Sequence, residues 1–213
     1  NVPITIVFNK ILTAYQTGRY KIIINEGSSR SSKTYSSLQF IIYLCILTPN
    51  YKVTVSRLKL TWLRKTVYED FKWIMQNHFE PLWLGGVMHK SEMIFTFQNG
   101  STVTFIGSEE SQKLHGLKQN LYYGNEYDEA AMKQFTQAII RTSDLFLIDY
   151  NPKFTDHWIY TNVETRSDAV LLKSTYKDNP FLPDSIKAQI EDLKRTDEAL
   201  YQIYALGEKA ISK

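Results

Sequence analysis

The hydrophobic positions of this chain alternate between short runs typical of strands and longer stretches with helical spacing. Apolar residues at helical spacing predict helices over Phe8–Tyr20, Thr34–Leu47, Thr61–Asn77, Ala131–Arg141 and Pro183–Leu206, the last broken near Arg195–Asp197. Short apolar or alternating runs predict strands over Tyr20–Asn25, Tyr51–Ser56, Met93–Phe97, Thr102–Ile106, Leu121–Gly124 and Leu145–Asp149. Strands that alternate with helices predict an α/β fold with a mostly parallel sheet that helices cover on both faces.

One pair of strands is expected to be antiparallel. Met93–Phe97 and Thr102–Ile106 are separated by Gln98-Asn99-Gly100-Ser101. An Asn-Gly pair accepts the positive φ angles of a tight turn, so this spacing predicts a β-hairpin.

The segment between the first strand and the second helix has the spacing of a phosphate-binding loop. It consists of Gly27, Ser28, Ser29, Arg30, Ser31, Ser32, Lys33 and Thr34. In the pattern G-x-x-x-x-G-K-[ST], backbone N–H groups bind phosphate oxygens, the lysine reaches the terminal phosphates and the hydroxyl binds Mg²⁺. The order of strand, loop, Lys-Thr and helix therefore predicts a nucleotide site at the carboxyl ends of the strands.

Ser32 stands where this pattern usually has its second glycine. Serine is tolerated there if the backbone avoids positive φ or if the surrounding fold holds it in that conformation. A serine-rich turn before a buried helix is the alternative interpretation of the same residues. The order of the elements favours the phosphate-binding loop.

Hydrolysis of a phosphoanhydride also requires an acid near Mg²⁺ and a group that orients the attacking water. The segment Leu121–Ala130 offers two registers. In the first, the strand ends at Asn125 and Glu126, so Glu126 orients the water and an amide takes the metal position. In the second, Asp128 and Glu129 are the metal ligand and the base. We favour the first because it fits the strand length, with Asp128 or Glu129 assisting through water. A solvated acidic loop is the alternative without chemistry.

Composition narrows the class of protein. A chain of 213 residues, 43% hydrophobic and 22% charged, predicts one soluble globular domain. The net charge of +3 permits a polyanionic partner without requiring one. Arg57, Lys59, Arg64 and Lys65 are candidates for contact with DNA or a neighbouring subunit, or are simply solvated. The single cysteine, Cys45, excludes an internal disulfide and predicts a reducing compartment.

Several motifs together resemble the ATPase domain of the large terminase subunit of tailed bacteriophages, the motor that packages DNA into a procapsid. Besides the loop, the resemblance is carried by Lys113–Leu117, Asn125–Glu129, Asp149–Pro152 with His157-Trp158, and Thr175–Pro183. The last two are the most specific, because phosphate-binding loops occur in many families.

The resemblance implies a RecA-like P-loop NTPase fold of the additional-strand, catalytic-glutamate type, which binds ATP and Mg²⁺. It implies that Glu126 is the catalytic glutamate and that Asn125 is a tolerated variant of an acidic position. Lys33 would neutralise the β- and γ-phosphates, and Thr34, Asn125 and Asp128 would surround Mg²⁺. Asn151 is the expected γ-phosphate sensor. An N-terminal residue is expected to contact adenine, with Gln16 the candidate for its edge.

The partners implied by the resemblance are viral double-stranded DNA, a portal protein, a small terminase subunit and further copies in a ring, with the isolated domain monomeric. The location implied is the host cytoplasm, at the portal of the procapsid, with no membrane. Residues 1–180 are expected to be the ATPase core, and residues 181–213 a helical segment that leads to an absent nuclease domain. This chain is therefore expected not to cleave DNA.

Two departures from the family pattern matter. His115 stands where related terminases commonly have an arginine that acts on the neighbouring subunit's nucleotide, so Lys113, Lys118 or Arg30 would have to supply the charge. Asn125 replaces a carboxylate. A nucleotide kinase, a helicase-like P-loop protein and a module that binds nucleotide without hydrolysis are the alternatives to the motor.

Overall fold

Parallel β-strands form the centre of the fold in the computed structural model, which describes residues 2–109, 116, 118–152 and 157–209. The strands are β1 (Ile22–Gly27), β2 (Lys52–Arg57), β3 (Val87–His89), β4 (Ile94–Thr96), β5 (Thr102–Gly107), β6 (Gln119–Gly124), β7 (Thr142–Tyr150) and β8 (Ala169–Ser174). The helices are α1 (Ile6–Gln16), α2 (Lys33–Leu47), α3 (Leu60–Lys65), α4 (Val67–His78), α5 (Glu80–Gly85), α7 (Met132–Ile139), α8 (Trp158–Asn162), α9 (Asp184–Thr196) and α10 (Glu198–Tyr201).

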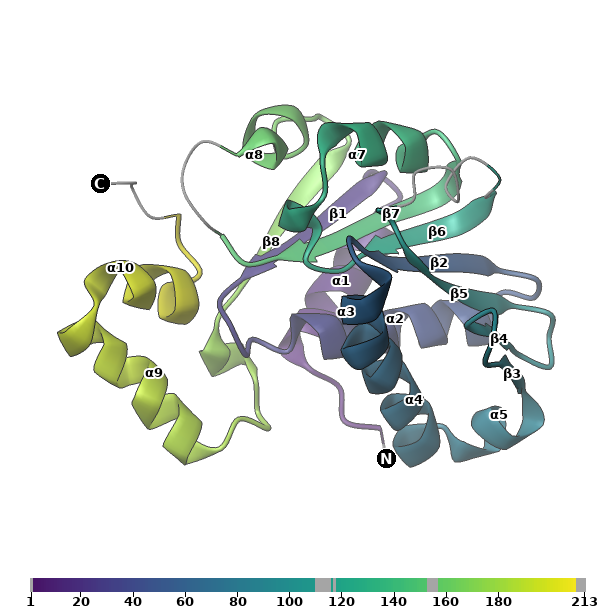
Figure 1. Cartoon of the computed structure of the whole chain (residues 1–213), viewed down its shortest axis with the longest axis horizontal. Coiled ribbons are helices and arrows are strands. Elements are labelled where there is room, and N and C mark those ends of the chain that lie inside the picture. The colour runs from purple at the N-terminus through teal and green to yellow at the C-terminus, as the bar shows by residue number, and fades with distance from the viewer. Residues whose placement is uncertain (1, 110–115, 117, 153–156, 210–213) are drawn as a thin grey trace.

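The described strands form one eight-stranded sheet in the order β3-β4-β5-β2-β6-β7-β1-β8 (Figure 1). Every pair from β5 to β8 in this order is parallel, and β4 pairs antiparallel with both β3 and β5. One strand, β7, lies between β1 and β6. Because parallel strands end at the same edge of a sheet, the segments after β1, β6 and β7 converge there.

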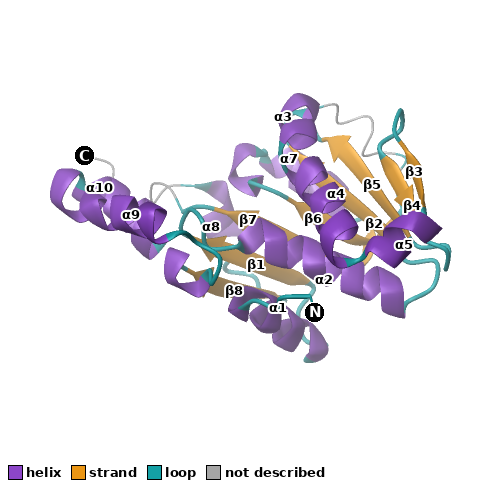
Figure 2. Ribbon diagram, turned by 90° about the horizontal axis from the view of Figure 1, so that it is seen from below, coloured by secondary structure: helices purple, strands orange, loops and turns teal. Residues whose placement is uncertain are grey.

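Helices cover both faces of the sheet. α1, α2 and α4 lie on one face and α7 and α8 on the other (Figures 1 and 2). Along β1 the side chains alternate: Ile23 belongs to the apolar core under α1, α2 and α4, and Ile22 and Ile24 belong to the core under α7 and α8. Burial on both faces explains why this strand is a continuous apolar run in the sequence.

Most predicted elements are confirmed, and two differences have physical causes. The predicted helix Thr61–Asn77 is two helices, α3 and α4, because Thr66 leaves the helical region with φ −127° and ψ −101°. Its hydroxyl donates to the Trp62 carbonyl and accepts from Arg57. β8 was not predicted, because this edge strand is only half-buried and lacks a clear alternation of apolar residues.

The predicted hairpin is confirmed as β4 and β5. Gly100 has φ +82°, and the turn is closed by Phe97 N donating to the Ser101 carbonyl over 2.8 Å. The break predicted in the C-terminal helix is also confirmed, at Asp197 between α9 and α10. Within the described residues, no helix is long and apolar enough to cross a membrane.

The C-terminal segment returns to the loop that follows β1. α9 and α10 lie to the left of the sheet in Figure 1, and a π-helical turn, Gln202–Leu206, ends at Gly207. Gly207 has φ +66°, and a Cβ built there would lie 2.8 Å from Ser28 N. Asn179 also donates to the Arg30 carbonyl over 2.8 Å. Gly207, near the end of the described chain, and Asn179 therefore both lie against the loop.

Gly207→Ala should lower the free energy of unfolding more than Gly18→Ala. Both glycines have φ near +65°, but a Cβ on Gly18 meets nothing within 4 Å, whereas one on Gly207 meets the loop backbone. The shared φ cost is about 1–2 kcal/mol, and overpacking should add about 1–3 kcal/mol at Gly207 alone. Urea unfolding of the two variants measures the difference, and equal losses would show that the contact with Ser28 is unimportant.

Candidate active site

The loop between β1 and α2 has the backbone of an anion-binding turn. Arg30 and Ser32 adopt positive φ angles of 62° and 67°, and left-handed residues of this kind occur in the backbone turns that bind anions. The serine at the glycine position is thus in the conformation that glycine favours, and the fold holds it there. Ser31 is buried and accepts a hydrogen bond from Ser174 Oγ of β8 over 3.0 Å.

Lys33 lies folded back across this loop. Its ammonium donates to the carbonyls of Gly27 (3.1 Å) and Ser28 (2.8 Å) and to Asn151 Oδ1 (2.7 Å). Burial lowers the pKa of Lys33, and the nearby carboxylates of Asp149, Glu126 and Asp128 oppose that shift. The structure thus joins the loop lysine to the predicted γ-phosphate sensor, which follows β7.

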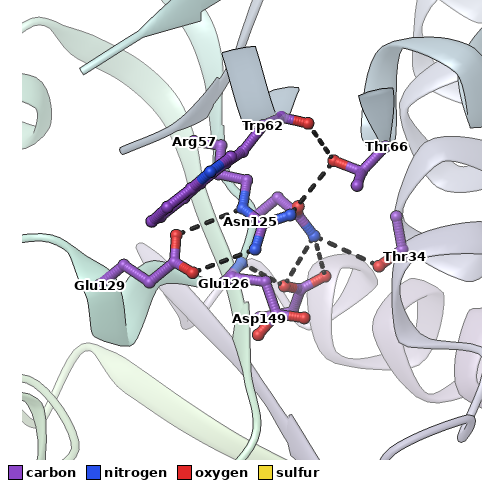
Figure 3. A network of polar contacts seen from close by, with 8 residues as sticks. All are labelled: Thr34, Arg57, Trp62, Thr66, Asn125, Glu126, Glu129 and Asp149. Carbon is purple, nitrogen blue, oxygen red and sulfur yellow. Dashed lines mark hydrogen bonds and ion pairs between the residues drawn. The ribbon is translucent and has the colours of Figure 1, made fainter. Parts of the chain in front are cut away.

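The amide of Asn125, the residue predicted to lie at the metal, joins the acidic segment to the loop. β6 ends at Gly124, directly before Asn125, as the favoured register requires. Asn125 Nδ2 donates to Thr34 Oγ1 over 3.2 Å and to Asp149 Oδ1 over 3.1 Å (Figure 3). The predicted metal residues Thr34 and Asn125 are therefore in contact.

A buried carboxylate, Asp149 at the end of β7, was not among the predicted site residues. Its side chain accepts hydrogen bonds from Glu126 N (2.8 Å), Asn125 Nδ2 and the Tyr123 hydroxyl. Burial raises the pKa of Asp149, and Lys33 and the hydrogen-bond donors oppose the shift. The available signal was its position at the end of a strand next to β6, inside the motif Asp149–Pro152.

Glu126 is held in an uncommon backbone conformation, with φ 49° and ψ 51°. Burial, followed by repulsion from Asp149, raises the pKa of its carboxyl to about 7, although Lys33 opposes this. A carboxyl with a pKa near neutrality can accept a proton efficiently at physiological pH.

A cavity of about 350 Å³ lies between the loop, Glu126 and Asn151. It is lined by Ser29, Arg30, Ser31, Ser32, Lys33, Thr34, Tyr35, Glu126, Asn151 and Asn179. Tyr35 and Asn179 were not predicted, because neither belongs to the loop or to the acidic segment. The cavity brings residues from four separate parts of the chain into one polar space.

Three predicted residues lie elsewhere. Glu129 is ion-paired with Arg57 over 3.0 Å, and Asp128 is in the 3₁₀ turn Tyr127–Glu129 outside the cavity lining. Gln16 is exposed at the end of α1, where neighbouring Tyr15 bonds Asp144 near the start of β7. That end of the sheet is opposite the loop, so the structure does not bring Gln16 to the site. His115 and Lys113 lie outside the described residues.

The oxygen atoms present suit Mg²⁺. Thr34 supplies a hydroxyl oxygen and Asp149 a carboxylate, and Asn125 Nδ2 donates a hydrogen bond to each of them. Within the described residues, no group of three His, Cys, Asp or Glu side chains is arranged to hold a metal. Hydroxyl and carboxylate oxygens are ligands that Mg²⁺ takes in proteins, together with water and phosphate oxygens.

Comparison with known proteins identifies the class. The family model for the phage terminase large subunit matches residues 19–208, so the chain belongs to that family. The mostly parallel eight-stranded sheet flanked by helices, with β7 between β1 and β6, matches the fold of terminase ATPase domains.

Three relatives are informative. The large terminase subunit of Bacillus phage SPP1 is 22% identical over 94% of this chain and 52% of its own length. The large terminase of a thermophilic bacteriophage superposes with a TM-score of 0.81 at 18% identity, over 98% of this chain and 54% of that one. The complex of that terminase with ADP superposes with a TM-score of 0.79, also at 18% identity, over 96% of this chain and 53% of that one. The large terminase ATPase domain of Thermus phage P74-26 superposes with a TM-score of 0.70 at 10% identity, over 92% of this chain and 91% of that one. The chain spans about half the length of the curated relative.

Ser32→Gly should raise the free energy of unfolding by up to about 1 kcal/mol. Glycine removes the strain of φ 67°, about 1–2 kcal/mol, and loses about 0.5–1 kcal/mol in chain entropy. Ser32→Ala is the matched control, since it keeps the strain and removes only a buried hydroxyl that has no hydrogen-bond partner within the described residues. Urea unfolding compares the two, and a Gly variant less stable than the Ala variant would contradict the strain.

Glu126→Gln should be more stable than the wild type at pH 8, with a smaller difference at pH 5. The folded protein keeps the Glu126 proton up to a pKa of about 7, whereas the unfolded chain releases it near 4.5. Wild-type stability therefore falls as the pH rises through that window, by about 1–3 kcal/mol. Urea unfolding at both pH values measures this. Glu92 is exposed, so Glu92→Gln is the control, and its free energy of unfolding should match that of the wild type at both pH values.

Proposed function

We propose that this chain is the ATP-hydrolysing motor domain of a phage DNA-packaging terminase. The observation that carries the proposal is the convergence of the loop lysine, Asn151, Asn125 and Glu126 at one end of the sheet. Support also comes from the ADP complex of the thermophilic bacteriophage relative and from the Thermus phage protein described as a terminase ATPase domain.

In the proposed mechanism, the loop backbone and Lys33 bind the phosphates. Lys33 now bonds Gly27, Ser28 and Asn151, so a phosphate that enters the cavity would take up ammonium donors used for the loop carbonyls. Asn151 already contacts that ammonium, and it would sense the γ-phosphate through this shared lysine. Negative charge stabilises the protonated lysine, which burial disfavours.

Glu126 orients the attacking water and takes its proton. The proton moves to the Glu126 carboxylate as the water oxygen bonds to the γ-phosphorus and the bond to the β–γ bridging oxygen breaks. Asp149 fixes the Glu126 backbone through the 2.8 Å hydrogen bond from Glu126 N. Thr34 and Asn125, with Asp149 or Asp128 through water, would hold Mg²⁺, which neutralises phosphate charge when bound.

Family membership supports the wider role that we propose. Hydrolysis would drive viral double-stranded DNA into a procapsid, in the host cytoplasm, by a ring of subunits docked on a portal protein and recruited by a small terminase subunit. Residues 1–180 would form the ATPase core, and residues 181–213 would lead toward a nuclease domain. The domain alone would hydrolyse ATP weakly as a monomer if a neighbour completes the site.

Phosphate release and nucleotide binding by three variants test the assignment. Lys33→Ala should weaken the binding of ATP. Glu126→Gln should bind ATP with Mg²⁺ normally but lose about 10²–10⁴-fold in kcat. Asp128→Asn should keep most of its activity, and Glu92→Gln is the control. Measurements run at increasing protein concentration and with duplex DNA.

Two results would contradict the proposal. Loss of hydrolysis in Asp128→Asn alone would show that the favoured register is wrong and would support the second register, with Asp128 as the metal ligand. Tight ATP binding without any hydrolysis by the wild type, even when concentrated with DNA, would favour a nucleotide-binding module, as the serine at position 32 and the amide at position 125 allow.

A further inference from the structure

The end of β2 places an arginine beside the acidic segment. Ser56 pairs with Gly124 in the parallel ladder, and Asn125 N donates to the Ser56 carbonyl over 2.8 Å. Arg57 is therefore the β2 residue that lies next to the start of the segment Asn125–Glu129. The sequence made Arg57, with Lys59, Arg64 and Lys65, a candidate for contact with DNA or a neighbouring subunit, but its side chain points toward Glu129 and Thr66 (Figure 3).

The guanidinium of Arg57 is fixed on three sides. It donates to both carboxylate oxygens of Glu129, from Nη2 over 3.0 Å and from Nε over 3.2 Å. Nη1 donates to Thr66 Oγ1 over 3.2 Å, and the Trp62 ring lies 5.5 Å from its central carbon. The Arg57 side chain is 17% exposed and that of Glu129 is 21% exposed. A two-point pair of this kind gives directional restraint that a lysine cannot reproduce.

Glu129 is joined directly to the backbone of Glu126. Glu129 N donates to the Glu126 carbonyl over 3.1 Å, and Glu126 N donates to Asp149 over 2.8 Å. The backbone at Glu126 is strained, with φ 49°. Asp149 of β7 holds its N–H, and the backbone N–H of Glu129, the partner of Arg57, holds its carbonyl. Strain of this kind persists only where neighbouring groups over-determine the conformation.

Charge gives the same arrangement a second role. Four carboxylates, those of Glu126, Asp128, Glu129 and Asp149, are accompanied by Lys33 and Arg57. Lys33 belongs to the phosphate loop and would be engaged by nucleotide. Arg57 comes from β2 and does not line the cavity. Its positive charge therefore remains paired with Glu129 when a nucleotide is bound.

We propose that Arg57 is a positioning residue for Glu126, acting through Glu129 as a brace from β2 to the backbone of the water-orienting acid. The expected effect on kcat rests on the proposed hydrolytic function, whereas the hydrogen bonds that form the brace do not depend on it. The hydrogen bonds of the Arg57 side chain go to Glu129 and Thr66, neither of which lines the cavity. Its removal should therefore change the orientation of Glu126 without changing nucleotide affinity.

The test is a double-mutant cycle with two measurements. Arg57→Gln, Glu129→Gln and the double variant are compared by hydrogen exchange over residues 125–130 and by the kcat and KM of ATP hydrolysis. Each single variant should speed exchange of the Glu129 amide and lower kcat about 10–100-fold with KM unchanged. The double variant should lose no more than either single one, because both break the same link. Arg57→Lys should recover only part of kcat.

The matched control is the ion pair of Arg166 with Asp168. It has the same two-point geometry, at 2.8 Å for both bonds, but lies at the start of β8, away from the loop. Arg166→Gln and Asp168→Asn should leave kcat and exchange over residues 125–130 unchanged. A fall in kcat equal to that of the Arg57 variants would indicate general destabilisation and overturn the proposal.

The remaining outcomes are distinct. Unchanged exchange in the Arg57 variants, additive losses in the double variant, or a raised KM with normal kcat would each overturn the brace. Faster exchange with normal kcat would show a structural ion pair and overturn the positioning role. If the wild type hydrolyses no ATP, the proposed function and the positioning role fail together, while the exchange data still decide whether the brace exists.

Discussion

The fully buried carboxylate of Asp149 is the interaction on which the site depends. It lies at the end of β7, the strand between the loop strand and the acidic strand, and bonds both Asn125 and the Glu126 backbone. A buried carboxylate is costly unless donors and positive charge surround it. Those donors come from β6 and the residues directly after it, and the nearby ammonium of Lys33 comes from α2. Satisfying one acid therefore draws three elements to a common point.

Backbone strain is concentrated at the same end of the sheet. Among the described residues other than glycine, Arg30, Ser32 and Glu126 have positive φ in the site, and only Asn50 and Met93 share this elsewhere. The loop conformation prepares N–H groups for an anion, and the Glu126 conformation aims an acid into the cavity. Both features exist before any ligand binds, so the protein meets the conformational cost during folding.

The C-terminal segment gives this end of the sheet a mechanical connection. Gly207 packs on the backbone of Gly27 and Ser28, and Asn179 holds the Arg30 carbonyl. Lys209 forms a 2.7 Å ion pair with Glu164, whose other carboxylate oxygen accepts from the Tyr150 hydroxyl. A displacement of the loop would therefore displace the segment that follows α10, and the reverse also holds.

The sequence by itself determined the alternation of strands and helices, the hairpin at Gly100 and the loop Gly27–Thr34, because periodicity, turn chemistry and motif spacing are local. It also favoured the register in which Asn125 and Glu126 directly follow β6, which ends at Gly124. Only the tertiary structure decided which side chains meet. Asp149 reaches Asn125 from the neighbouring strand, and Ser174 and Asn179 reach the loop from distant segments. Glu129 pairs with Arg57, and Gln16 lies at the opposite end of the sheet. Such contacts depend on strand order and register, which arise from burial across the whole sheet and leave no local pattern in the chain.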